Sequence, residues 1–171
     1  MSKDKDNFLV KSNISTEEEL NRKEFETLFE NSPLSPFELL SNLPLYMKRQ
    51  NIARLLHFND MYKQVVNIHG EMMEFGVRWG PNLALLTSLR GIYEPHNYTR
   101  KIIGFDTFEG FPNVNEKDGT SGVITEGAYA VTNSYEEHLE QVLSYHESEA
   151  PLNHIKKYEI NRNTRWWKNQ N

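Results

Sequence analysis

The spacing of apolar and polar residues predicts a strand, a turn, a helix and a second strand in the middle of the chain. Residues 72–80 are predicted to form a short apolar strand that ends in an acidic residue, Glu74, and then a glycine-containing turn. A helix-like run over residues 81–89 follows directly. Residues 101–106 then form a second apolar run that closes on Asp106. A strand, a glycine turn, a helix and a strand with a terminal acid are the plan of a nucleotide-binding βαβ unit.

The segments before this unit are predicted to be helical. Ser15 and Glu18 have the spacing of a capping box, which predicts a helix that runs to about Glu30. Three further helices are predicted, and they begin at Ser35, at Asn42 and at residue 60, the last ending at residue 66. Residues 1–14 are expected to be flexible, and residues 15–68 are assigned to a helical cap outside the sheet.

The segments after this unit are more polar. Gly91 is predicted to end the first helix of the unit, and a polar loop follows the second strand as far as residue 132. A loop of that length is usually functional or disordered. A helix over residues 133–146 and a third strand over residues 157–160 are predicted next. Residues 161–171 form a polar tail.

The residue types of the glycine turn fit a ligand that has a ribose and a charged end. Gly76 lets a ligand approach the main chain, and Gly80 allows close packing where the turn meets the helix. Asp106 can accept two hydrogen bonds from a ribose diol, and Glu74 can meet the ammonium group of an amino-acid-like ligand. The spacing differs from the G-x-G-x-x-G pattern of dinucleotide sites and favours S-adenosylmethionine over NAD. Glycine turns also occur without a ligand, and a terminal aspartate is often only a turn cap, so the interpretation rests on both features together.

Composition and charge narrow the classes of function. The chain has 171 residues, enough for one domain with a core, and carries a net charge of −5 with a pI of about 5.7. An acidic chain without a basic face is not expected to bind nucleic acid. Cysteine is absent, which excludes thiolate metal sites and fits a cytoplasmic protein. No apolar run is long enough to cross a bilayer, so no membrane partner is expected.

Two motifs together give the chain a family likeness. The acidic glycine turn at residues 74–80, followed by Gly-Phe-Asp-Thr-Phe-Glu-Gly-Phe-Pro at residues 104–112, resembles the macrocin O-methyltransferase (TylF-like) family. Members are class I, S-adenosylmethionine-dependent enzymes that typically methylate sugar hydroxyls of natural products, and many require magnesium. The resemblance implies an α/β, Rossmann-like class I methyltransferase fold. The cofactor-binding domain would cover residues 69–160, after the N-terminal helical cap.

By that resemblance, seven residues are assigned to binding S-adenosylmethionine. They are Glu74, Gly76, Val77 and Gly80 in the turn at the methionine end, Asp106 at the ribose, and Thr107 and Phe108 beside the adenosine. The loop over residues 110–129 would correspond to a mobile segment that closes over cofactor and substrate, and the helical cap to a dimer-forming element. The implied partners are a sugar-bearing small molecule and a second copy of the chain.

The end of the chain departs from the family pattern. Family members are longer, whereas here the third predicted strand is followed by a tail that holds Trp166 and Trp167 and no aspartate. We therefore expect a C-terminally truncated domain that lacks the family's magnesium ligands and general base, and we assign no metal-binding or catalytic residue. Weak cofactor binding and little turnover are expected as a consequence. The alternative is a non-catalytic interaction protein built on the same fold.

Overall fold

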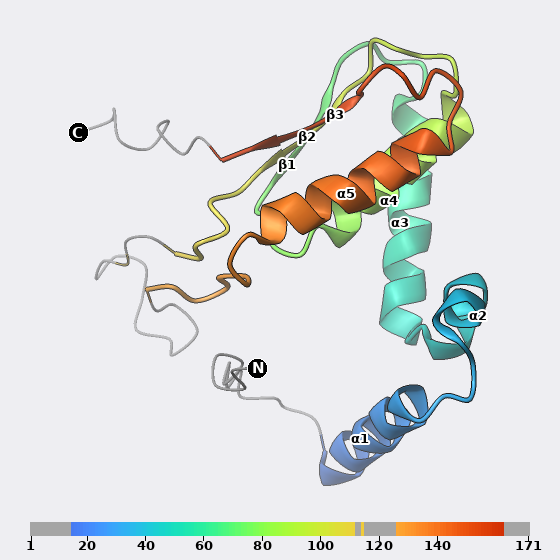
Figure 1. Ribbon diagram of the computed structural model, residues 1–171, viewed down its shortest axis with the longest axis vertical. Coiled ribbons are helices and arrows are strands. Elements are labelled where there is room, and N and C mark those ends of the chain that lie inside the picture. Colours follow the sequence, from blue (N-terminus) through green and yellow to red (C-terminus); the bar gives the residue numbers. More distant parts are fainter. Residues whose placement is uncertain (1–14, 112–113, 115–125, 163–171) are drawn as a thin grey trace. The chain divides into compact units, whose positions relative to one another are not determined.

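The computed structural model describes residues 15–111, 114 and 126–162 (Figure 1). The chain divides into two compact units, residues 1–54 and residues 55–171. The segment 1–14, predicted to be flexible, lies outside the described residues, as does the predicted polar tail except for its first two residues.

The first unit consists of short helices whose side chains are exposed or half-buried. They are α1 (Thr16–Glu30), α2 (Pro36–Ser41) and the 3₁₀ helix η1 (Leu43–Tyr46). The predicted capping box is confirmed at the start of α1, where the Glu18 N–H donates to Ser15 Oγ at 3.2 Å and the Ser15 N–H donates to Glu18 Oε2 at 3.0 Å. None of the side chains in α1, α2 or η1 is buried. Local signals in the sequence therefore set the bounds of these helices.

Helix α3 (Arg49–Val65) is one continuous helix. The prediction of one helix from Asn42 and another over residues 60–66 is wrong, because the chain forms η1 first and then the whole of α3. No glycine or proline lies within α3, so no local signal ends the helix part-way. The boundary between the two units falls inside α3, between residues 54 and 55. The division into a helical cap over residues 15–68 and a cofactor-binding domain over residues 69–160 remains a prediction.

The second unit is built on a parallel sheet. Its described strands are β1 (Met72–Phe75), β2 (Ile102–Phe105) and β3 (Tyr158–Asn161), in the spatial order β1-β2-β3. Helix α4 (Pro81–Tyr93) connects β1 to β2, and helix α5 (Tyr135–Ser148) lies between β2 and β3 in the sequence. Both helices pack on one face of the sheet (Figure 1). Parallel strands joined through helices confirm the βαβ arrangement that the sequence predicts.

The core of this unit lies between the sheet and the helices α4 and α5. Its buried residues are Val77, Leu83, Ile102, Phe108, Leu139, Leu143 and Tyr158. Gly104 in β2 has no side chain because the space is filled: a Cβ there would lie 2.8 Å from Val77 Cγ2 and 2.9 Å from Leu83 Cδ2. The opposite face of β1 remains apolar and exposed, with Met73 at 54% and Phe75 at 74% of full exposure.

Helix α4 runs past the glycine that was expected to end it. Gly91 lies inside the helix, which continues to Tyr93, so that prediction is wrong. Two tertiary contacts explain the extension. A Cβ at position 91 would lie 3.4 Å from Ala150 Cβ, and the ring of Tyr93 stacks on that of Tyr62 from α3 with centroids 5.8 Å apart. Packing of this kind outweighs the cost of about 1 kcal/mol that glycine imposes within a helix.

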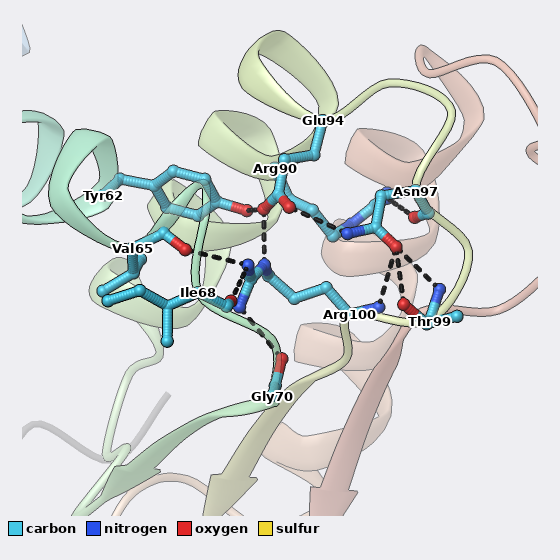
Figure 2. A network of polar contacts seen from close by, with 9 residues as sticks. All are labelled: Tyr62, Val65, Ile68, Gly70, Arg90, Glu94, Asn97, Thr99 and Arg100. Carbon is cyan, nitrogen blue, oxygen red and sulfur yellow. Dashed lines mark hydrogen bonds and ion pairs between the residues drawn. The ribbon is translucent and has the colours of Figure 1, made fainter.

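A buried polar network holds the end of α3 at the amino ends of the strands (Figure 2). Arg100 Nε donates to Glu94 Oε2 at 2.5 Å, and the Tyr62 hydroxyl donates to the same oxygen at 2.6 Å. The Arg100 guanidinium also donates to the carbonyls of Val65, Ile68 and Gly70 at 2.7–3.0 Å. These bonds satisfy main-chain carbonyls at the end of α3 and in the turn that follows it. The network thereby fixes where β1 begins.

The same network changes two pKa values. Burial alone would raise the pKa of Glu94, but hydrogen bonds from Arg100, Tyr62 and Asn97 hold it below the usual range. Burial, together with the bond to the Glu94 carboxylate, raises the pKa of the Tyr62 hydroxyl far above its ordinary value. The carboxylate therefore stays ionised and the phenol stays protonated at neutral pH, which is the pairing that the hydrogen bonds require.

Candidate functional site

Two turns meet at the carboxyl ends of β1 and β2, where ligands bind in open α/β sheets. The first turn leads from β1 into α4, and the second follows β2. Asp106 links them, because its Oδ2 accepts the Arg78 N–H at 2.7 Å and its Oδ1 accepts the Phe108 N–H at 2.7 Å. A terminal aspartate was expected either to bind a ribose or to cap a turn. Capping is the role visible in the structure, and each carboxylate oxygen keeps a lone pair for a further donor.

Glu74 lies in β1 and is half-buried beneath the first turn. Its Oε1 accepts a hydrogen bond from Asn82 Nδ2 at 3.0 Å. Asn82 stands in the first turn of α4, so this bond ties the strand to the start of the following helix. The predicted contact between Glu74 and the ammonium of a cofactor remains a prediction.

The two predicted glycines serve different purposes. Gly76 has φ +85° and is exposed, and apart from its two chain neighbours no described residue has an atom within 4 Å of the position where a Cβ would stand. Gly80 has φ +71° and begins α4, and a Cβ there would lie 2.5 Å from Leu139 Cδ1. Gly80 is therefore required by the packing of α4 against α5. Gly76 leaves open space at the end of β1, as expected of a glycine that a ligand approaches.

Two of the other predicted site residues point into the protein. Val77 and Phe108 are buried members of the core, so only their main chains face the turns. Phe108 has φ +61°, and its carbonyl accepts the Val131 N–H at 3.2 Å. Thr107 Oγ1 accepts the Glu109 N–H and donates to the Gly110 carbonyl, both at 3.2 Å. Contacts of Thr107 and Phe108 with an adenosine stay predictions, and for Phe108 they are limited to the main chain.

The structure adds a group of residues that the sequence did not identify. The guanidinium of Arg78 lies 5.1 Å from the ring centroid of Tyr129 and 5.9 Å from that of Trp79. Tyr135 packs edge-on against Trp79 at 4.7 Å and donates its hydroxyl to the Trp79 carbonyl at 2.9 Å. Burial raises the pKa of Tyr135, which keeps that donor protonated. The sequence did offer one indication of this group, because Arg78 and Trp79 lie between the two glycines of the turn.

The geometry of the turns fits the cofactor that the family likeness implies. An open approach to the main chain at Gly76, carboxylates at the ends of two neighbouring strands and a helix that begins at Gly80 form the donor and acceptor set that an amino-acid nucleoside needs. Among the described residues, no group of three or more histidine, aspartate or glutamate side chains is placed to hold a metal ion. Within the same residues, no helix is both long enough and apolar enough to cross a membrane.

Solved structures resemble this chain over most of its length. The crystal structure of CalS11, a calicheamicin methyltransferase, matches with a TM-score of 0.82 and 38% identity, over 89% of this chain and 60% of that one. This chain has the fold of a class I methyltransferase. The apo structure of CalS11, described as a TDP-rhamnose 3'-O-methyltransferase of calicheamicin biosynthesis, matches with a TM-score of 0.71 and 33% identity, over 89% of this chain and 57% of that one.

The match covers only part of the CalS11 chain, and this decides what can be said about function. The chain spans about 60% of the length of the methyltransferase it resembles. The activity and substrate of the whole enzyme therefore come to this chain only as proposals. No protein-family model matches the chain, and no curated protein matches it either.

Proposed function

We propose that this protein is an S-adenosylmethionine-dependent O-methyltransferase that acts on a sugar hydroxyl. The observation that carries the proposal is the 38% identity to CalS11 across nearly the whole chain. CalS11 is described as a TDP-rhamnose 3'-O-methyltransferase, so the acceptor of that enzyme is a hydroxyl of a nucleotide-linked sugar. The open turn at Gly76 supports the proposal, because it leaves room for a cofactor at the expected place.

The roles of individual residues follow from this placement. S-adenosylmethionine, when bound, supplies an electrophilic methyl group. The main chain at Gly76 and Val77 would border its methionine end, and the remaining lone pairs of Asp106 would accept the ribose hydroxyls. The hydrogen bond from Asn82 holds the Glu74 carboxylate at the base of the turn. Such fixed groups accelerate transfer mainly through proximity and alignment.

Three further expectations belong to the same proposal. Membership of the macrocin O-methyltransferase family would bring an acceptor on a natural product; the magnesium ion that many members require has no ligand assigned in this chain. A homo-oligomer formed through the first unit is proposed because large apolar side chains are exposed there, Phe37 and Leu40 among them. A cytoplasmic location is proposed from the absence of cysteine.

The proposal can be tested with two glycines at opposite ends of β1. Gly70 and Gly76 both have positive φ and open space beside the Cα, so alanine strains the backbone at either position. We expect calorimetric titration with S-adenosylhomocysteine to show binding by the wild-type chain and by Gly70→Ala. Binding by Gly76→Ala should weaken at least about tenfold, because its methyl group enters the space assigned to the cofactor. Thermal melting of both variants controls for folding.

Each outcome separates the alternatives. Equal binding by Gly76→Ala and Gly70→Ala would place the cofactor elsewhere. A folded wild-type chain that binds no S-adenosylhomocysteine would contradict the methyltransferase proposal and favour an interaction protein built on the same fold. Light scattering with a candidate partner would then be the next measurement.

A further inference from the structure

Arg78 is a cation in the candidate site that has no acidic partner among the described residues. Its guanidinium forms no ion pair there, and its Nε is buried without a hydrogen-bond acceptor in that part of the chain. Two buried arginines, by contrast, each have a carboxylate partner. Arg90 is paired with Glu147 at 2.5 Å, and Arg100 with Glu94 at 2.5 Å. A partly buried charge of this kind is costly unless an anion accompanies it.

A hydrogen bond and an unusual backbone angle fix the position of Arg78. Its N–H donates to Asp106, and its φ of +50° places it in the left-handed region that residues with a Cβ seldom adopt. That conformation directs the side chain away from the core that the neighbouring Val77 enters, and toward Tyr129. Local strain of this kind persists where surrounding structure enforces it, and it often accompanies a functional position.

Two aromatic rings with accessible surface, those of Trp79 and Tyr129, lie beside the guanidinium, and Phe111 packs against the second of them. Trp79 is 38% exposed, Tyr129 is 36% exposed, and Phe111, whose ring packs edge-on against Tyr129 at 5.6 Å, is 40% exposed. The segment that carries Tyr129 is anchored by main-chain bonds between Phe111 and both Gly127 and Ala128. The rings therefore belong to a fixed framework at the carboxyl edge of the sheet.

The two features together indicate the chemistry of a ligand. A planar guanidinium is suited to bidentate pairing with phosphate, and aromatic faces stack on nucleobases and sugar rings. A neutral glycoside would use the rings and leave the charge without a partner. A carboxylate alone would use the charge and leave the rings bare. A sugar joined to a nucleoside diphosphate uses both. The cofactor also carries an anion and a base, so titrations with the two ligands separately must distinguish them.

We propose that Arg78, with Trp79, Tyr129 and Phe111, binds the nucleoside diphosphate portion of a nucleotide-linked sugar acceptor. This inference rests on the proposed methyltransferase function and narrows its substrate class from sugars in general to nucleotide sugars. Arg78 pairs with the phosphates, and the aromatic rings contact the base or the sugar. The reacting hydroxyl lies on the sugar, away from the arginine.

The test uses the full chain, with thymidine diphosphate and S-adenosylhomocysteine as separate probes in calorimetric titrations. Arg78→Gly removes the charge, keeps the N–H that donates to Asp106 and suits a positive φ, so the variant should fold. We expect it to bind thymidine diphosphate at least about tenfold more weakly than wild type, and S-adenosylhomocysteine within about twofold of wild type. Arg78→Lys should be intermediate. Arg22→Gln, an exposed arginine of α1, controls for net charge and should bind both probes as wild type does.

The possible results distinguish this inference from the function on which it rests. A wild-type chain that binds S-adenosylhomocysteine but not thymidine diphosphate would overturn the inference alone. A chain that binds neither probe would overturn both. If Arg78→Gly loses only S-adenosylhomocysteine, the guanidinium serves the carboxylate of the cofactor and the inference is wrong. Tyr129→Leu gives an independent check, since it should weaken thymidine diphosphate binding without altering the charge.

Discussion

Gly80 and Leu139 allow a quantitative test of how the glycine turn is held. Alanine at position 80 would carry its Cβ 2.5 Å from Leu139 Cδ1 and 2.8 Å from Leu139 Cδ2, both far inside van der Waals contact. It would also hold a side chain at φ +71°. Left-handed strain of about 1–2 kcal/mol and overpacking of about 1–3 kcal/mol give an expected destabilisation of about 2–5 kcal/mol for Gly80→Ala.

A double-mutant cycle separates the two contributions. Leu139 is buried, so Leu139→Ala alone should cost about 2–5 kcal/mol through the cavity it creates. In Gly80→Ala/Leu139→Ala the clash disappears and the new methyl group partly fills the cavity. The double variant should therefore be less destabilised than the sum of the single variants by at least about 1 kcal/mol. Left-handed strain remains in it, so recovery is incomplete.

Urea unfolding followed by far-ultraviolet circular dichroism measures each free energy of unfolding. The reasoning fails if the effects of the two substitutions are additive within about 0.5 kcal/mol, because then position 80 does not meet Leu139. It also fails if Gly80→Ala is neutral. In either case α4 and α5 would approach one another less closely than the structure indicates.

Two further predictions concern the buried charges. Glu147→Gln should destabilise the fold by about 3–5 kcal/mol, because it leaves two buried cations, Arg90 and Lys157, without their carboxylate. Glu137→Gln on the exposed side of the same helix is the control, and a difference below about 1 kcal/mol in urea unfolding would contradict the expectation. The pKa of Glu94 is lower in the folded chain than the ordinary 4.5, so its stabilising contribution is complete above that pH and is lost as the pH falls through the folded value. Urea midpoints measured between about pH 6 and about pH 3 should therefore decline more steeply for wild type than for Glu94→Gln, and parallel slopes would argue against this assignment.

The sequence predicted the elements of the second unit better than the roles of its residues. The order of strand, turn and helix was readable because apolar periodicity and glycine placement are local features. Asp106 was found as a key residue for the same reason, since it ends an apolar run. The hydrogen bond that its carboxylate accepts from the Arg78 N–H could not be foreseen, because it spans 28 positions and depends on the pairing of β1 with β2.

Phe108 is a residue whose side-chain direction the sequence did not reveal. The sequence groups it with Asp106 and Thr107 as a residue beside the cofactor, yet a positive φ turns its side chain into the core. Arg78 was overlooked for the complementary reason. Its neighbour Tyr129 lies on a distant segment, and only the folded chain brings that ring, with Phe111 packed against it, to the guanidinium.

What the sequence determined by itself was the set of local structures: the capped helices, the βαβ order and the glycine turn with its two acids. Capping boxes, periodicity and glycine conformations act within a few residues, so they can be read without the fold. What only the tertiary structure decided was the side of the turn that each residue faces, the extent of α3 and α4, and the placing of Arg78 beside the rings of Trp79 and Tyr129. Those features depend on contacts between segments far apart in the chain, and burial and packing in the folded chain set them.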